Sequence, residues 1–345
     1  MTHARGFIFV EYGQLLPSER SVGTSLFYAL TRLGEEPVIC FFVLSGFLVG
    51  GRAIERIVSE RFVLTDYLVD RCSRIFPPLV AAQLLTTLVA MYAGIPVNFL
   101  HFLGNLLSLQ PVVVPPYAGN APLWSLAYEV WFYVLVGVVA VIAQQRHHLR
   151  LAIAILLLAT VLSLLAPVYL FCWLIGSVAY LMLRTVRVSI GYVCVAGVFL
   201  LMSIAALQLG AGGSMSARLL QGAEQGAAVL KALSQLVLAG CVAYLFIAVV
   251  RLTPRTRVTL VLERLGTYCA GFSFSLYLMH YPLLNLLSHL GVGKYNVLSP
   301  TSTGVYVLAV TACCAVAWII SLCVERNVYA IRMAVHRRFD RSVGV

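Results

Sequence analysis

Glu129 is the residue whose type and position most clearly indicate chemistry. It lies in residues 122–143, an otherwise apolar run that is long enough to cross a bilayer. A carboxylate at membrane depth is costly, so it usually has a function or a buried partner. Trp124 and Ser125 add an indole and a hydroxyl to the same run. We predict that something polar is handled within the membrane; a purely structural partnership of Glu129 with an arginine or tyrosine is the alternative.

Arg71 and Arg74 form a second candidate site, directly before the apolar segment 75–94. Because they are three residues apart, a helix would present both on one face. Guanidinium groups bind phosphates through paired hydrogen bonds. The pair is therefore a candidate phosphate-binding site, although ordinary anchoring of a membrane segment by positive charge explains it equally well.

Tyr277 and His280 are also three residues apart, within segment 266–290. Pro282 follows them and frees backbone carbonyls of the same helix. This pattern favours the lining of a substrate pocket, and an interhelical hydrogen-bond network is the alternative. We assign Trp124 and Ser125 to the same pocket, where the indole would stack on a sugar ring; anchoring at the membrane interface explains Trp124 as well.

Apolar helices must position these side chains. The chain is 61% hydrophobic and 11% charged, whereas a soluble domain has about 25% charged residues. A span needs roughly 20 apolar residues, so we predict an all-α polytopic membrane protein with about ten transmembrane helices. Nine of them are 38–51, 75–94, 122–143, 149–166, 169–183, 190–209, 232–250, 266–290 and 304–324. Segments 13–37 and 95–121 are then long outside loops, which are often lids or binding surfaces.

The basic residues predict the orientation of the chain. Of the 24 Lys and Arg residues, 18 fall in alternate segments and five fall in the segments between them. The rich segments are 52–74, 144–150, 184–189, 251–264 and the chain after residue 325. Short cytoplasmic loops accumulate such residues, so we expect a cytoplasmic C-terminus with a basic tail, 326–345. The net charge of +11 reflects this topology and requires no nucleic acid as a partner.

The N-terminal residues suggest a tenth membrane helix. Residues 1–12 look like the end of another crossing, but at about 1.5 Å per residue they cannot cross a bilayer. We therefore expect a first helix that is truncated at its N-terminus. The nine cysteines show no metal-ligand spacing, and we predict no metal site.

Four strings in fixed order resemble the membrane-bound acyltransferase-3 family. They are residues 41–48 (FFVLSGFL), 70–77 (DRCSRIFP), 124–129 (WSLAYE) and 275–282 (SLYLMHYP). Each string is weak alone, but the series extends over most of the chain. The resemblance implies one membrane domain over residues 1–325 and an enzyme that O-acylates surface glycans or metabolites.

The resemblance also implies catalytic residues. The most diagnostic element of the family is an Arg followed ten residues later by a His in the first helix. His3 fits the His position as catalytic base, while the Arg would lie before Met1; this departure puts activity in question. An imidazole with a pKa near ~6.5 suits proton removal from a hydroxyl at neutral pH; a poorly ordered terminal histidine is the alternative. Glu129 would orient this histidine or bind the acceptor hydroxyl.

The predicted protein is therefore a multi-pass O-acyltransferase of the inner membrane. Arg71 and Arg74 would hold acyl-CoA, by family habit acetyl-CoA, as co-substrate, and no cofactor would remain bound. The partners would be the lipid bilayer, the acyl-CoA and a glycan or another hydroxyl acceptor. Direct attack by the acceptor and transfer through an acyl-histidine are equally compatible with the sequence.

Two other functions fit parts of the same pattern. Intramembrane acids also mark the substrate pathway of transporters, so an exporter of glycan or lipid is one alternative. An inactive family member with a truncated first helix is the other. Binding of coenzyme A distinguishes a transferase from a transporter.

Overall fold

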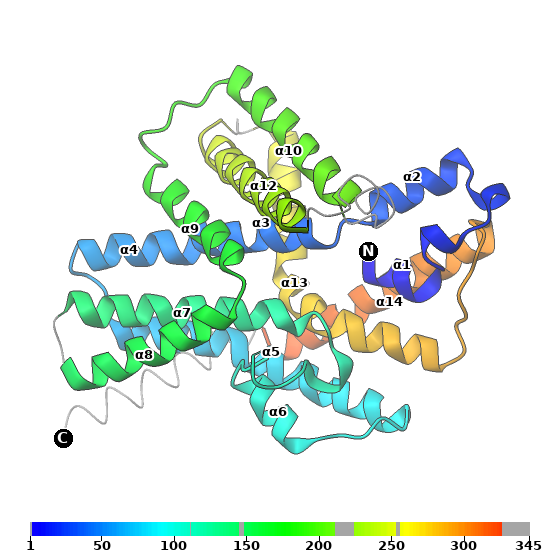
Figure 1. Cartoon of the computed structure of the whole chain (residues 1–345), viewed down its shortest axis with the longest axis horizontal. Helices are drawn as coiled ribbons and strands as arrows, with labels where there is room; N and C mark the ends of the chain where they lie inside the picture. Colours follow the sequence, from blue (N-terminus) through cyan, green and yellow to red (C-terminus); the bar gives the residue numbers. More distant parts are fainter. Residues whose placement is uncertain (1, 111, 145–147, 211–223, 253–255, 326–345) are drawn as a thin grey trace. The chain divides into compact units, whose positions relative to one another are not determined.

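The computed structural model describes residues 2–110, 112–144, 148–210, 224–252 and 256–325. In these residues every regular element is a helix, as predicted, and β pairing is limited to one isolated bridge between Phe9 and Tyr295 (Figure 1). The predicted basic tail 326–345 lies outside the described residues. The α-helices are α1 Thr2–Ile8, α2 Val22–Thr31, α3 Glu35–Ser45, α4 Gly51–Val58, α5 Leu64–Tyr92, α6 Phe99–Leu106, α7 Leu123–Ala143, α8 His148–Leu164, α9 Pro167–Leu181, α10 Ile190–Gly210, α12 Glu224–Leu252, α13 Arg257–His289 and α14 Pro300–Cys323.

Short helical turns connect some of these helices. Three are 3₁₀ turns: η1 Tyr12–Gln14, η2 Pro17–Glu19 and η4 Tyr117–Gly119. A fourth, η3 Gly46–Gly50, is a π-helical turn that joins α3 to α4. Single π turns are rare and occur frequently at functional sites.

The chain forms two compact units, each assembled from separate parts of the sequence. Unit 1 comprises residues 1–33, 65–127 and 260–345, and unit 2 comprises residues 34–64 and 128–259. Unit 1 therefore contains α1, α2, α5, α6, α14 and most of α13. Unit 2 contains α3, α4, α8, α9, α10 and α12, and α7 passes from unit 1 into unit 2 after Ala127.

Each of the nine predicted apolar segments falls on a helix, but the count of about ten spans is not confirmed. Six helical stretches of the described chain are long and apolar enough to cross a membrane, or seven if the bent pair formed by α8 and α9 is one span. The six are Val22–Val58, Leu64–Tyr92, Leu123–Ala143, Ile190–Gln208, Gly226–Leu252 and Pro300–Cys323. This number still makes the protein a multi-pass membrane protein.

Two local features lower the count. Pro167 starts α9, and the residue before a proline disfavours helical geometry; the bend between Ile155–Leu164 and α9 is 114°. Helix α13 is absent from the six because hydroxyl groups and His280 interrupt its apolar sequence.

The two predicted outside loops contain helices of their own. In segment 13–37, Ser21 caps α2, its hydroxyl accepting from the amide of Thr24 at 3.1 Å. In segment 95–121, the Asn98 carboxamide caps α6 by accepting from the amides of Leu100 and His101. Such caps pair the free amides of a helix start and stabilise it by about 1 kcal/mol. Both segments are therefore folded, and α2 belongs to the candidate span Val22–Val58.

Helix α1 is held in place by packing within unit 1. Its residues Ile8 and Phe9 enter a buried apolar cluster with residues of α2, α13 and α14. The backbone pairs with the segment before α14: Tyr295 N donates to Ile8 O at 2.8 Å, and Val10 N donates to Tyr295 O at 3.2 Å. Arg5 is buried, with its guanidinium 4.9 Å from the ring centre of Tyr28. A seven-residue helix is unstable alone, so these contacts keep it folded.

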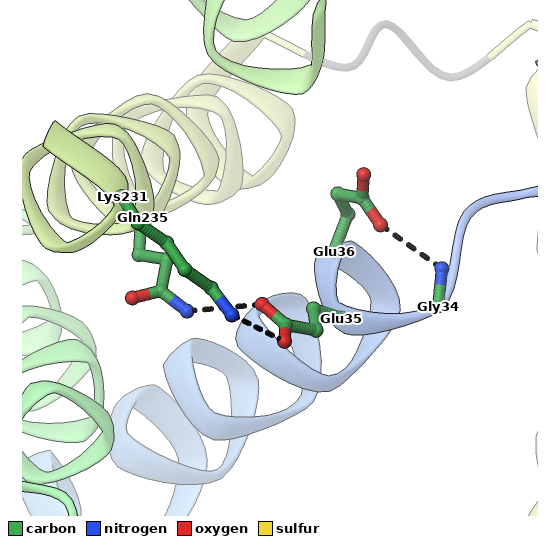
Figure 2. A network of polar contacts seen from close by, with 5 residues as sticks. All are labelled: Gly34, Glu35, Glu36, Lys231 and Gln235. Carbon is green, nitrogen blue, oxygen red and sulfur yellow. Dashed lines mark hydrogen bonds and ion pairs between the residues drawn. The ribbon is translucent and has the colours of Figure 1, made fainter. Parts of the chain in front are cut away.

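Helix α3 is tethered to α12 in unit 2 by a polar network (Figure 2). Glu35 accepts from Lys231 Nζ at 2.7 Å and from Gln235 Nε2 at 3.2 Å, while Glu36 accepts from the amide of Gly34 at 3.0 Å. Both carboxylates lie in the first turn of α3, where the helix dipole favours negative charge.

Small residues bring α9 into backbone contact with α3 and η3. A Cβ atom added at Gly46 would lie 1.9 Å from Trp173 O, and one added at Gly176 would lie 2.0 Å from Val43 O. Close approach of this kind is how membrane helices pack without a hydrophobic driving force. Glycine is required at both positions because the neighbouring backbone leaves no room for a Cβ atom. Backbone conformation is not the reason, since neither glycine is left-handed.

We expect Gly46→Ala and Gly176→Ala each to destabilise the protein by at least about 2 kcal/mol, because backbone atoms cannot move aside as a flexible side chain does. Thermal unfolding in detergent measures the effect. Gly197→Ala is the matched control, since a Cβ there meets nothing within 4 Å. Equal melting temperatures for the three variants would contradict the packing argument.

Candidate active site

Two histidines from opposite ends of the sequence meet in unit 1. The ring centres of His3 on α1 and His280 on α13 are 5.2 Å apart. Tyr281 closes the group, with its ring centre 5.3 Å from that of His3 in an edge-to-face arrangement. His3 is exposed and His280 is half-buried. The structure therefore brings together the predicted base and a predicted pocket residue, and a reactant can reach His3.

Backbone contacts of His280 define its proton-bearing nitrogen. Its Nδ1 lies 3.0 Å from Leu276 O and 2.9 Å from Tyr277 O. Carbonyl oxygens only accept, so Nδ1 carries the hydrogen in these bonds. A neutral ring then keeps a lone pair on Nε2. His280 consequently has the electronic form of a general base, a role that the sequence interpretation gave to His3 alone.

The predicted pocket residues Ser125 and Tyr277 are directly bonded. Ser125 Oγ and Tyr277 Oη are 2.7 Å apart, and Tyr277 Oη donates to the carbonyl of Pro122. The serine therefore donates to the tyrosine in this chain of bonds. The Tyr277 ring centre is 6.4 Å from that of His280. Trp124, one residue before Ser125 on α7, is half-buried.

Asn120 is a site residue that the sequence analysis missed. A proline at position 282 leaves the carbonyl of Leu278, four residues earlier, without its helical donor. Asn120 Nδ2 donates to that carbonyl at 3.0 Å, and the side chain is 1% exposed. Asn120 thus completes the broken turn of α13 between Tyr277 and Tyr281. Pro282 was the available signal, because a freed carbonyl inside a membrane requires a donor from elsewhere.

A cavity of about 630 Å³ contains both predicted phosphate-binding arginines. Arg71 and Arg74 contribute from α5, and the opposite walls come from α13 and α14. The other lining residues are Asp70, Ser73, Thr267, Tyr268, Ala270, Gly271, Phe272, Trp318, Ser321, Leu322 and Glu325. The volume lies in the range of small-molecule sites, about 300–1,000 Å³.

Helix α13 joins this cavity to the histidine pair. Its residues Thr267 to Phe272 line the cavity, and His280 lies eight residues beyond Phe272. At about 1.5 Å per residue the separation along the helix is about 12 Å. Between these two features, the backbone amide of Ser275 donates to Glu325 Oε1 at 3.0 Å. This bond holds Glu325, a carboxylate of the cavity lining, against α13. One rigid element therefore positions both features.

Glu129 lies in unit 2, in a buried group of hydroxyls and an indole. Its carboxylate accepts from Ser45 Oγ at 3.0 Å and from the hydroxyl of Tyr133. Trp173 Nε1 donates in turn to Ser45 Oγ at 3.3 Å. Glu129 is 6% exposed, and these bonds compensate for part of the cost of burying its charge. The tyrosine partnership weighed for Glu129 on sequence grounds is thus present.

The described residues contain no group of three His, Cys, Asp or Glu side chains that could hold a metal ion. The chemistry available to the described site is that of imidazoles, hydroxyls, carboxylates and guanidinium groups. Such a set can transfer protons and bind anionic groups.

We expect the bond between Asn120 and Leu278 to contribute about 1 kcal/mol to stability, as buried hydrogen bonds do. Asn120→Ala should lower the melting temperature, since it leaves the Leu278 carbonyl without a donor. In a Pro282→Ala background, position 282 regains an amide that can serve the same carbonyl, so Asn120→Ala should cost less there. The double-mutant cycle measures this difference; strictly additive effects would show that the bond does not compensate for the proline.

Comparison with known proteins gives one match. A family model described as an acyltransferase domain, Acyl_transf_3, matches residues 8–322. No curated protein matches the chain. No solved structure matches it either.

Proposed function

The chain belongs to the acyltransferase-3 family, and from this membership we propose that it moves an acyl group, by preference acetyl, from acyl-CoA to a hydroxyl of a glycan or glycan-like acceptor. Membership supports a membrane acyltransferase directly. The donor, the acceptor and the acetyl preference are the proposal. The observation that carries the proposal is that one helix, α13, both lines the cavity that contains the two arginines and carries one histidine of the pair.

The cavity that contains Arg71 and Arg74 is the proposed donor site. Coenzyme A has several phosphate charges, and two guanidinium groups on one helix face match them. Tyr268 and Trp318, from α13 and α14, offer aromatic surfaces for the adenine ring. The basic residues that flank this end of α5 place the cavity on the cytoplasmic side of the inner membrane, with the C-terminus, in the proposed topology. The acyl donor is made on that side.

The histidine pair is the proposed centre of the chemistry. In direct transfer, an imidazole takes the proton of the acceptor hydroxyl while the hydroxyl oxygen attacks the thioester carbonyl. The tetrahedral intermediate then expels coenzyme A as a thiolate, which receives the proton from the imidazolium. In the alternative, an imidazole nitrogen attacks the thioester first and expels coenzyme A as a thiolate, which leaves an acyl-histidine. The acceptor hydroxyl then attacks the acyl carbonyl while the second imidazole takes its proton, and the first histidine leaves as a free imidazole. Ser125 and Tyr277 position the acceptor hydroxyl in this proposal, with Trp124 against its sugar ring.

Glu129 is proposed to be required for activity through its bonds to Ser45 and Tyr133. These bonds fix its carboxylate in a buried, low-dielectric site. Glu129→Gln keeps the shape of the side chain and removes the charge. Loss of acyl transfer with an unchanged melting temperature would support the role, and unchanged transfer would exclude it.

Arg71→Ala and Arg74→Ala should each weaken the binding of coenzyme A by about tenfold or more, because each removes a charge-assisted phosphate contact. Calorimetry on the purified protein measures the dissociation constant. Arg56→Ala is the matched control, since Arg56 belongs to the same predicted cytoplasmic segment and lies outside the cavity lining. Equal weakening by all three would indicate general electrostatics, and no binding to the unaltered protein would favour a transporter.

His3→Ala and His280→Ala should each lower acyl transfer at least about 100-fold, the typical contribution of a general base. Transfer of labelled acetyl from acetyl-CoA to a panel of glycans, in membranes that contain the protein, measures this. His289→Ala, an exposed histidine at the end of the same helix α13, is the control. Label retained on the protein in the absence of acceptor, and lost with one histidine, would identify an acyl-histidine.

The transferase proposal fails if the unaltered protein binds coenzyme A but transfers no label to any acceptor of the panel. It also fails in its assignment of the base if both histidine variants retain the activity of His289→Ala. These outcomes separate an error about the reaction from an error about the residues.

A further inference from the structure

An apolar groove of about 450 Å³ runs between α9 and α12 in unit 2. Helix α9 contributes Phe171, Leu174 and Val178, and α12 contributes Leu236, Gly240 and Ile247. Helix α12 is one of the candidate membrane spans, and α9 belongs to the bent pair. The groove therefore lies between two candidate membrane segments, and none of its lining residues belongs to the features assigned to acyl transfer.

Arginines mark one end of this groove. Val186 lines that end, and its carbonyl accepts from the guanidinium of Arg251. Tyr244 also lines the groove, and its hydroxyl donates to the carbonyl of Arg187 at 3.3 Å. Arg184, Arg187 and Arg251 are all exposed. The apolar groove thus ends beside the guanidinium of Arg251, and Arg184 and Arg187 flank Val186 in the sequence.

Arginines outnumber carboxylates in the segments around this end. Residues 167–210 and 226–252 contain no Asp or Glu, and Glu224 of α12 lies at the opposite end of that helix from Arg251. Glu55 on α4 accepts from the hydroxyl of Tyr180 at 2.9 Å and keeps its negative charge. One carboxylate against Arg184, Arg187 and Arg251 leaves a positive excess that a mobile anion can neutralise.

We propose that the groove holds one acyl chain of an anionic phospholipid whose headgroup phosphate contacts Arg184, Arg187 and Arg251. Basic sites between membrane helices bind lipid headgroups in this way. The chain in the groove supplies dispersion contacts that an empty groove would lack. The charged end distinguishes this lipid from the general lipid around the protein, which packs equally well but without a charge preference.

A substitution at Gly240 can test this proposal directly. A Cβ at this position meets nothing within 4 Å, so a larger side chain can enter the groove without a clash against the backbone. Gly240→Leu would occupy the space of the lipid chain. Gly197→Leu on α10 is the matched control, because Gly197 has the same freedom and does not line the groove.

The test compares phosphatidylglycerol with phosphatidylcholine of identical acyl chains, added to the delipidated full-length protein in detergent. A ligand that binds only the folded state raises the melting temperature. We expect phosphatidylglycerol to raise it more than phosphatidylcholine in the unaltered protein and in Gly197→Leu. Gly240→Leu should lose this difference. Native mass spectrometry should show one phosphatidylglycerol fewer bound to Gly240→Leu.

Charge variants test the other end of the groove. Arg187→Gln and Arg251→Gln should each weaken phosphatidylglycerol binding roughly fivefold, the usual effect of one basic residue near a lipid headgroup. Arg61→Gln, in the predicted cytoplasmic segment after α4, controls for general charge. Equal stabilisation by the two lipids, an unchanged lipid response in Gly240→Leu, or an equal loss with Arg61→Gln would each overturn the proposal. None of these readouts depends on acyl transfer.

Discussion

The hydrogen bond from Asn120 to the carbonyl of Leu278 is the contact on which the arrangement of unit 1 depends. Leu278 is fully buried, and a buried carbonyl that a proline has freed is costly without a hydrogen-bond donor, so Pro282 is tolerated only with a donor at this point. The bond fixes α13 between Tyr277 and Tyr281, the stretch that carries His280. Because the same helix lines the arginine-rich cavity, one buried amide helps to hold the two proposed substrate sites in register.

Unit 2 meets the same physical constraint with different residues. Gly46 and Gly176 allow the backbones of two segments to touch, and this close contact brings Trp173 and Ser45 within hydrogen-bonding distance. Ser45 then donates to Glu129. A carboxylate that would be unfavourable in hydrocarbon is thus accommodated by polar neighbours that tight helix packing supplies.

Sequence reasoning predicted the helical class and the position of all nine apolar segments, since hydropathy reports directly on burial in an apolar medium. It also assigned Ser125 and Tyr277 to one pocket, and these residues are bonded in the structure; the expected base His3 lies beside the pocket residue His280. It missed Asn120, whose partner lies 158 residues away, because no local pattern encodes so distant a donor. It treated α2 and α6 as loops, since their amphipathic character is weak evidence without a surface to pack on. The count of about ten spans is not confirmed, since six helical stretches of the described chain pass the length and composition test, or seven if the bent pair of α8 and α9 is one span.

The bridge between Phe9 and Tyr295 has a consequence for the order of folding. Helix α1 leaves the ribosome first, yet the backbone groups that pair with it lie almost 290 residues later. At roughly 5–20 residues per second, the N-terminal segment waits on the order of tens of seconds for its partner. His3 and His280 therefore come together only after α13 has been synthesised. Nascent chains that are released before that point carry the first histidine without the second, so the site cannot form in them.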